Sequence, residues 1–295
     1  MKRYKEGFKI YKKIEQLFPI NRSLTGEGNR KSLKILNSIC NNLKILEFKT
    51  GTKVYDWKIP VEWNVKDAYI KCENKKIIDF KKNNLHLMSY SEPIDKFVTF
   101  NELNKNLYSI KNKPNAIPYV TSYYKKRWGF CIEHSKRKLL SKKKKYHIFI
   151  DSKFKRRGSL SIGEIFIKGK SKKEILLSTN ICHPSMVNNE LCAPVILSFI
   201  SHYLKKKKNY YSTRILFLPE TIGAIAYLNK NLKKLKKNFR AGFHISCFGD
   251  KGNFSMINTK YKNSYSDLIA KKILKKDKDY KIYHFKYCGS HERQY

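Results

Sequence analysis

The chain has 295 residues, of which 41% are hydrophobic and 14% aromatic, so it is too rich in apolar side chains for a disordered protein. Its length favours two domains and a substantial core. The formal net charge is +41, from 64 Lys and Arg against 23 Asp and Glu.

The positive charge comes mainly from lysines spread between Lys2 and Lys286. A field of this strength could hold nucleic acid or an anionic membrane surface. Arginine, the better reader of phosphates and bases, is scarce beside lysine. The joint abundance of Lys, Asn, Ile and Tyr is typical of an AT-rich coding sequence, so we favour a solvated lysine-rich surface and expect no specific nucleic-acid partner.

The sequence carries no predicted membrane span, because no run approaches about 18 apolar residues. The N-terminal residues lack the apolar h-region of a signal peptide, which predicts a cytoplasmic protein. The cysteines are odd in number and widely spaced, and no Cys-x-x-Cys pair occurs, so neither a disulfide framework nor a structural zinc knuckle is predicted.

An amphipathic helix is predicted over residues 4–18 and ends at Pro19. Residues 21–28 form a turn-rich loop, and a second helix begins at Thr25 or Glu27 and continues to Leu43. Two interpretations of the loop remain open. It is either a simple helix–helix connection or a segment folded over a site, with Arg22 offering its guanidinium to a substrate carboxylate.

The periodicity changes to that of β-strands from about residue 46. Because this mainly β segment lies between two helix-rich ones, we predict a β-rich domain, residues 48–146, inserted into an α/β domain formed by residues 1–47 and 147–295. The predicted strands cover residues 54–60, 67–71, 75–80, 117–132, 146–151 and 158–167.

Strands and helices alternate in the C-terminal half, which predicts an α/β fold with a mixed, largely parallel sheet flanked by helices. Residues 175–179 are almost continuously apolar, as in a strand buried on both faces. Further strands are predicted at 212–221 and 241–250, and helices at 190–204, 223–235 and 266–274.

Three side chains at the end of a predicted strand or the start of the helix that follows it suggest a metal site. His183 follows the strand 175–179, Glu190 begins the next helix, and Glu220 ends the strand after it. Ends of adjacent parallel strands share one crevice, and zinc accepts imidazole and carboxylate ligands. The alternatives are a hydrogen-bonded structural pair of His183 and Glu190, and a Glu220 that only caps the following helix.

Six segments are distributed along nearly the whole chain: 17–28, 56–70, 117–124, 182–191, 219–223 and 289–295. In this order they resemble a bacterial aminopeptidase-like family that is often labelled as polysaccharide-biosynthesis proteins with an aminopeptidase-like domain. The resemblance implies a zinc-aminopeptidase-like α/β domain with a small β-rich domain inserted in it, normally followed by a winged helix.

The same resemblance implies His183 as a zinc ligand and Glu220 as the general base. It implies one zinc ion, bound by His183 and Glu190, because this chain departs from the co-catalytic di-zinc aminopeptidases. Three positions where those enzymes carry acidic ligands are changed here: Asn189, Thr221 and Ser246.

The last motif, residues 289–295, implies substrate-binding roles for Arg293 and Tyr295, with Arg293 anchoring a carboxylate or a developing oxyanion. His291 stands where the family usually carries Asp. The family sequence continues beyond the position of Tyr295 with a final metal ligand, so we expect a truncated or frameshifted copy.

The leading hypothesis is a zinc-dependent aminopeptidase-like or amide hydrolase that acts on a small peptide-like or N-acylated substrate and is linked to surface-polysaccharide biosynthesis. The main alternative is a non-catalytic binding or scaffold protein that keeps this fold. Nucleic-acid binding, which rests on charge alone, is the third.

Overall fold

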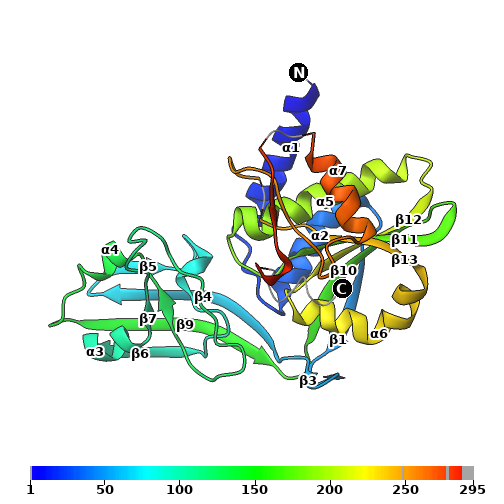
Figure 1. Ribbon diagram of the computed structural model, residues 1–295. Helices are drawn as coiled ribbons and strands as arrows, with labels where there is room; N and C mark the ends of the chain where they lie inside the picture. The colour runs from blue at the N-terminus through cyan, green and yellow to red at the C-terminus, as the bar shows by residue number, and fades with distance from the viewer. Residues whose placement is uncertain (1, 248, 277–278, 288–295) are drawn as a thin grey trace.

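The computed structural model describes residues 2–247, 249–276 and 279–287. Within these residues the chain folds into two lobes that lie side by side (Figure 1). The main lobe holds the N-terminal helices and most of the C-terminal half around a five-stranded sheet. The β-rich lobe is built around a four-stranded sheet from the segment between them.

The five-stranded sheet, called the main sheet below, has the strand order β1-β10-β12-β11-β13. β10 pairs antiparallel with β1 and β12, whereas β11 pairs parallel with β12 and β13, so the four strands other than β10 run the same way. The predicted α/β fold with a mixed, largely parallel sheet is therefore confirmed. The strands are β1 (Lys44–Lys49), β10 (Ser159–Ile167), β11 (Ser171–Asn180), β12 (Tyr211–Leu218) and β13 (Phe239–His244).

Both faces of the main sheet are covered by helices, and successive strand residues enter opposite cores. Ile215 of β12 packs in the same core as Leu33 of α2, and its neighbour Leu216 packs in the core that contains Ala224 of α6. Burying each large apolar side chain contributes about 1.5–3 kcal/mol. The helices are α1 (Lys2–Leu17), α2 (Glu27–Cys40), α5 (Cys192–Lys205) and α6 (Ile222–Asn238).

The four-stranded sheet, called the lobe sheet below, is antiparallel with the order β5-β4-β9-β6. Ala68 and Ile70 of β4 and Ile148 and Ile150 of β9 are buried in one core, and the residues between them face outward. The elements of this lobe are β4 (Glu62–Cys72), β5 (Lys75–Asp79), η1 (Asn84–His86), β6 (Ile94–Thr99), α3 (Phe100–Lys105), β7 (Leu107–Tyr108), β8 (Phe130–Cys131), α4 (His134–Arg137) and β9 (Lys145–Lys155).

The proposed domain boundaries each fall inside a strand. β1 belongs to the main sheet and continues past residue 47 to Lys49. β9 belongs to the lobe sheet and continues past residue 146 to Lys155, because it stays paired with β4 over that whole length. The predicted division, with a domain of residues 48–146 inserted into one formed by 1–47 and 147–295, stays a prediction. The strand pairings show that the lobe sheet extends from residue 62 to residue 155.

Two segments predicted as strands are folded differently. Residues 54–60 contain a tight hairpin of β2 (Lys53–Val54) and β3 (Trp57–Lys58), because Tyr55 at φ 52° is left-handed and ends the extended run. Most of 117–132 is irregular and only β8 is extended. Pro118 lacks the N–H that a ladder requires and Tyr123 has a φ of 39°, so alternation alone was misleading here.

The C-terminal described residues add β14 (Ser255–Ile257), α7 (Tyr265–Leu274), β15 (Lys281–Tyr283) and the short η3 (Phe285–Tyr287). α7 begins with a capping box in which Ser264 and Asp267 satisfy each other's backbone N–H groups. Among the helices of the described segments, none is both long and apolar enough to cross a membrane.

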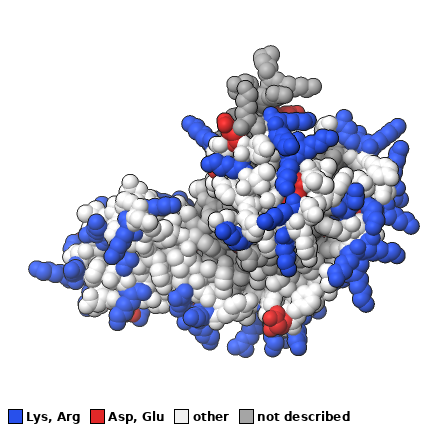
Figure 2. All heavy atoms as spheres, in the orientation of Figure 1, with Lys and Arg blue, Asp and Glu red and all other residues white. Residues whose placement is uncertain are grey.

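Lysine and arginine side chains cover both lobes in the face shown in Figure 2, with few acidic side chains between them. They are scattered over this face and do not form one separate patch. The distribution agrees with the even spread of lysine along the sequence.

A buried ionic contact joins the two lobes where β4 begins. Arg30 Nη2 of α2 lies 2.6 Å from Oε1 of Glu62, which is 2% exposed. Burial alone would raise the pKa of Glu62, but hydrogen bonds from Arg30, Asn64 and the backbone N–H of Ser159 outweigh it and lower the pKa to about 2. Nearby, Gly26 has a φ of 111°, and a Cβ there would lie 2.4 Å from the Trp63 carbonyl oxygen, so glycine is required.

Glu62→Gln is expected to lower the free energy of unfolding by about 2 kcal/mol near neutral pH, because it removes a charge-assisted hydrogen bond. The folded pKa lies below the unfolded value of 4.5, so the stabilisation is present above pH 4.5 and is lost as the pH falls towards 2. Urea unfolding of wild type and variant should therefore converge over that window. Glu73→Gln, at a 72% exposed side chain, is the control; an equal loss in both variants would contradict the prediction.

Candidate metal centre

The candidate site lies where the neighbouring parallel strands β11 and β12 end. β11 ends at Asn180 and leads to Cys182 and His183, and β12 ends at Leu218 and leads to Glu220. Carboxyl ends of adjacent parallel strands meet at one edge of the sheet, where open α/β sheets bind ligands. Residues that are far apart in the sequence are therefore brought into one crevice.

Three predicted site residues lie in direct contact. His183 Nδ1 is 2.7 Å from Glu190 Oε1, and His183 Nε2 is 3.1 Å from Glu220 Oε2. Burial opposes a charge on the imidazole, but the neighbouring Cys182 and Glu190 outweigh burial and raise the pKa of His183 above its ordinary value. The exposed fraction of the side chain rises from 0% at Glu190 to 10% at His183 and 26% at Glu220.

Glu190 is placed by η2 (Val187–Leu191), a single π-helical turn that leads directly into α5. Such turns are rare in proteins, and many of those that occur lie at functional sites. The carboxylate of Glu190 also accepts a short hydrogen bond from the backbone N–H of His183. The same side chain therefore fixes both the ring and the backbone of His183.

Cys182 belongs to the same cluster, and the sequence analysis did not predict it. Its thiol donates to Glu190 Oε1 at 3.5 Å, and the backbone N–H of Glu220 donates to its sulfur at 3.1 Å. Burial, followed by the charge of Glu190, raises the pKa of this thiol to about 11. Cys182 belongs to no Cys-x-x-Cys pair, and its position directly before His183 is the only signal of its role that the local sequence carries.

The backbone around the cluster is strained. Ser185, Tyr123 and Thr221 have φ values of 50°, 39° and 59°, in the left-handed region that non-glycine residues rarely adopt. Such conformations are costly and concentrate at functional sites. For Thr221 the cost is highest, because its side chain is β-branched.

Arg22 is fully buried behind the His183 loop. Its guanidinium donates to the carbonyl oxygens of Leu17 at 2.8 Å, Ile20 at 3.1 Å and His183 at 3.0 Å. Burial lowers the pKa of Arg22 to about 10, so the side chain stays charged near neutral pH. These three bonds hold the loop in place, whereas Nε has no hydrogen-bond partner among the described residues; the role of Arg22 in receiving a substrate carboxylate stays a prediction.

The β-rich lobe contributes an aromatic wall to the site. The Tyr119 ring lies 4.6 Å from the His183 ring, centroid to centroid, and its hydroxyl is 3.1 Å from that of Tyr123. Burial raises the pKa of Tyr119 well above its ordinary value, so the phenol stays protonated. Nothing in the local sequence of residues 117–124 indicated this contact.

The remaining candidate positions are not part of the cluster. Asn189 lies half-buried in η2, Thr221 is the residue before α6, and Ser246 follows β13. Within the described segments, the metal-ligating side chains that converge are those of Cys182, His183, Glu190 and Glu220. His291, Arg293 and Tyr295 lie outside the described residues.

The cluster fits a single zinc ion. The ligand atoms of its four residues lie within 4.8 Å of one another and comprise a thiol, an imidazole and two carboxylates, all ligand types of zinc. His183 Nδ1 is buried without an aligned hydrogen bond to any described residue, although Glu190 Oε1 is close. A buried donor or acceptor of this kind is costly unless another partner satisfies it, and a bound cation would do so.

This chain is similar over nearly its whole length to a longer protein. A curated protein of Clostridium acetobutylicum, described as a polysaccharide biosynthesis protein with an aminopeptidase-like domain, is 45% identical over 291 residues. The match covers 98% of this chain, and the chain spans 66% of the length of that relative. A crystal structure from the same organism, described as a candidate peptidase, has a TM-score of 0.94 at 45% identity and covers 98% of this chain and 68% of that one.

More distant solved structures share the fold. A zinc aminopeptidase from Bacillus subtilis has a TM-score of 0.60 at 13% identity, covering 92% of this chain and 78% of that one. A peptidase M28 precursor from Shewanella amazonensis has a TM-score of 0.56 at 11% identity, covering 97% and 80%. At such low identities the likeness shows the fold and does not transfer a site.

The fold seen here is thus the zinc-aminopeptidase fold that the sequence resemblance implied. The family described as a domain of unknown function, DUF4910, matches residues 11–295, which is nearly the entire chain. Together with the 45% identical relative, this match shows that the chain belongs to the DUF4910 family of aminopeptidase-like proteins.

Proposed function

We propose that this protein is a zinc-dependent, aminopeptidase-like amide hydrolase. The observation that carries the proposal is the convergence of Cys182, His183, Glu190 and Glu220 at the ends of β11 and β12. Zinc bound there would polarise a substrate carbonyl and lower the pKa of bound water to about 7.

The residues have distinct roles in this proposal. His183 and the fully buried Glu190 hold the metal, and Cys182 is available as a further ligand. Glu220, whose side chain is more exposed than that of Glu190, takes the proton of the attacking water and passes it to the leaving amine. Arg22 keeps the His183 loop in place through the carbonyl hydrogen bond.

This chemistry indicates the class of substrate. A small peptide-like or N-acylated molecule presents the amide that such a site attacks. The name of the Clostridium acetobutylicum relative supports a link to polysaccharide biosynthesis. The six cysteines of the described segments are free, which supports the proposal of a reducing, cytoplasmic location.

A non-catalytic scaffold is the second candidate, and one observation favours it. Asn189, Thr221 and Ser246 lack the carboxylates that would complete a two-metal site, and none of them joins the cluster. A protein that binds a ligand without turning it over would keep the fold and lose those acids.

Metal analysis tests the zinc centre. Purified wild-type protein is expected to hold about one zinc ion per chain, and His183→Ala is expected to lose it, because a buried nitrogen ligand is removed. The control is His202→Ala, at an exposed position on α5. Equal, sub-stoichiometric zinc in wild type and His183→Ala would end the metal proposal.

Activity assays with Glu220→Gln test the hydrolase. Against a panel of aminoacyl anilides and N-acylated amino sugars, this variant is expected to lose about 100-fold or more in kcat while keeping its zinc, because a proton acceptor is replaced by an amide. Glu15→Gln, on the exposed face of α1, should match wild type. If zinc-loaded wild type turned over none of the panel, the scaffold candidate would be favoured instead.

A further inference from the structure

The outward face of the lobe sheet carries aromatic side chains where an antiparallel sheet facing water usually carries polar ones. These residues alternate with the buried core positions of the same strands. They lie on three neighbouring strands: Tyr69 on β4, His147 and Phe149 on β9, and Phe97 on β6.

The rings form a continuous array across the strands. Tyr69 and Phe149 are stacked with centroids 4.8 Å apart, and so are Phe97 and His147. An edge contact of 5.7 Å between Tyr69 and His147 joins the two pairs. Phe97 is 70% exposed. Tyr69, His147 and Phe149 are half-buried, so the array is a partly exposed aromatic surface, and aromatic surface of this kind marks interaction sites.

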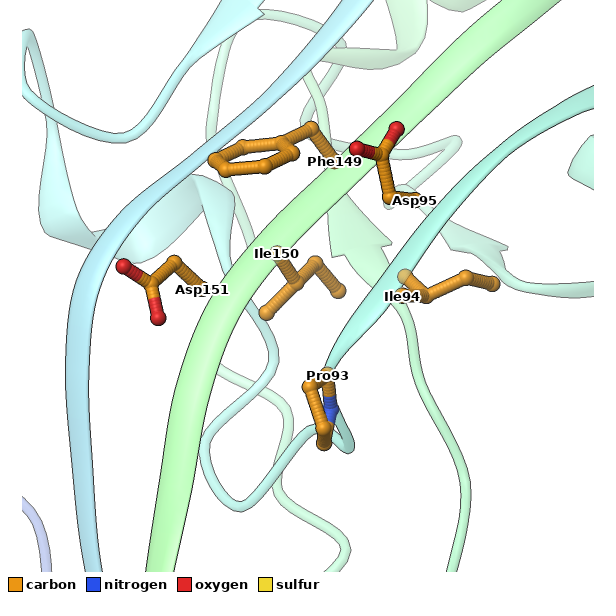
Figure 3. Close-up of a pocket in the computed structure, with 6 residues that line it drawn as sticks. All are labelled: Pro93, Ile94, Asp95, Phe149, Ile150 and Asp151. Carbon is orange, nitrogen blue, oxygen red and sulfur yellow. The ribbon is translucent and has the colours of Figure 1, made fainter.

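A depression of about 330 Å³ opens beside this array, between β6 and β9 (Figure 3). Phe149 forms part of its lining, and the carboxylates of Asp95 and Asp151 flank it on opposite sides (Figure 3). It is shallow and open to solvent, with apolar walls and a few polar groups, so it would hold a ligand against one side and would not enclose it.

This face carries charges of both signs: the Nζ atoms of Lys71 and Lys76 each lie 4.8 Å from the centroid of the Tyr69 ring, and carboxylates lie on the side towards β6 and β9. Asp67 and Asp151 are directly opposite on β4 and β9, a like-charge pairing that destabilises a sheet. Asp67 is paired with Lys81 at 3.0 Å, and Asp95 with His147 at 2.7 Å. Within the described part of the chain no hydrogen bond or ion pair engages the Asp151 carboxylate, so its acceptor oxygens are available.

We propose that the outward face of the lobe sheet binds an uncharged oligosaccharide. A sugar ring presents a C–H face that packs against aromatic rings, and its hydroxyl groups donate to carboxylates, which only accept. Single-stranded nucleic acid also stacks on aromatic rings, but it requires a cationic groove along its backbone. Asp95 and Asp151 on both sides of the depression would repel phosphates there, whereas the ammonium groups of Lys71 and Lys76 lie over Tyr69 at the other side of the array, so a neutral ligand fits the depression better.

Calorimetric titration with cellohexaose, maltohexaose, xylohexaose and chitohexaose tests the proposal. Wild type is expected to bind at least one of these, and Phe149→Ala and Asp151→Asn to weaken that binding at least about tenfold. Phe149→Ala removes a wall of the depression and Asp151→Asn a charged acceptor. Asp151→Asn keeps the side-chain shape, so it remains informative should the aromatic variant fail to fold.

Matched variants distinguish this face from the metal centre. Tyr261→Ala, at a 77% exposed aromatic residue of the main lobe, should bind sugar like wild type, as should His183→Ala. The proposal is overturned if wild type binds none of the four sugars, or if both face variants bind as wild type does. It is also overturned if single-stranded oligothymidylate binds and that binding, rather than sugar binding, is lost in Phe149→Ala.

Discussion

The candidate site depends on one buried negative charge, the carboxylate of Glu190. An uncompensated carboxylate in a protein interior is strongly unfavourable, so its neighbours must supply positive charge or hydrogen-bond donors. The His183 ring and backbone N–H and the Cys182 thiol do so directly. Arg22, buried on the other side of the same loop, adds a positive charge and binds the His183 carbonyl. A divalent cation would take over this compensation and satisfy His183 Nδ1.

Much of the site could be predicted because its residues follow strand ends. Parallel strands deliver whatever follows them to one edge, so an apolar run that ends in His183 and another that ends in Glu220 predicted their contact. The burial of individual side chains could not be predicted from the sequence in the same way. Arg22 has a side chain suited to binding a carboxylate, but its loop is packed under His183, and only the folded chain shows that both of its Nη atoms donate to backbone carbonyls.

For the fold as well, local sequence patterns predicted some elements correctly, and tertiary contacts determined others. The almost continuously apolar run 175–179 correctly predicted a strand with side chains in both cores: in β11, Leu176 packs in one core and Leu177 against the other. Alternation misled where single residues break an extended chain, as Tyr55 and Tyr123 do with their positive φ values. The length of β9 could not be predicted either, because the strand continues to Lys155 through its pairing with β4.

The strand β9 takes part in two different surfaces of the β-rich lobe. Its inward residues build the core of the β-rich lobe, which brings Tyr119 against His183 at the metal centre. Its outward residues include His147 and Phe149, which lie on the opposite face of the lobe sheet. Alternation along one strand thus separates a surface that meets the main lobe from a surface that faces solvent. In the proposed function, the outward face holds a polymer while a small amide-bearing group reaches the candidate metal centre in the main lobe.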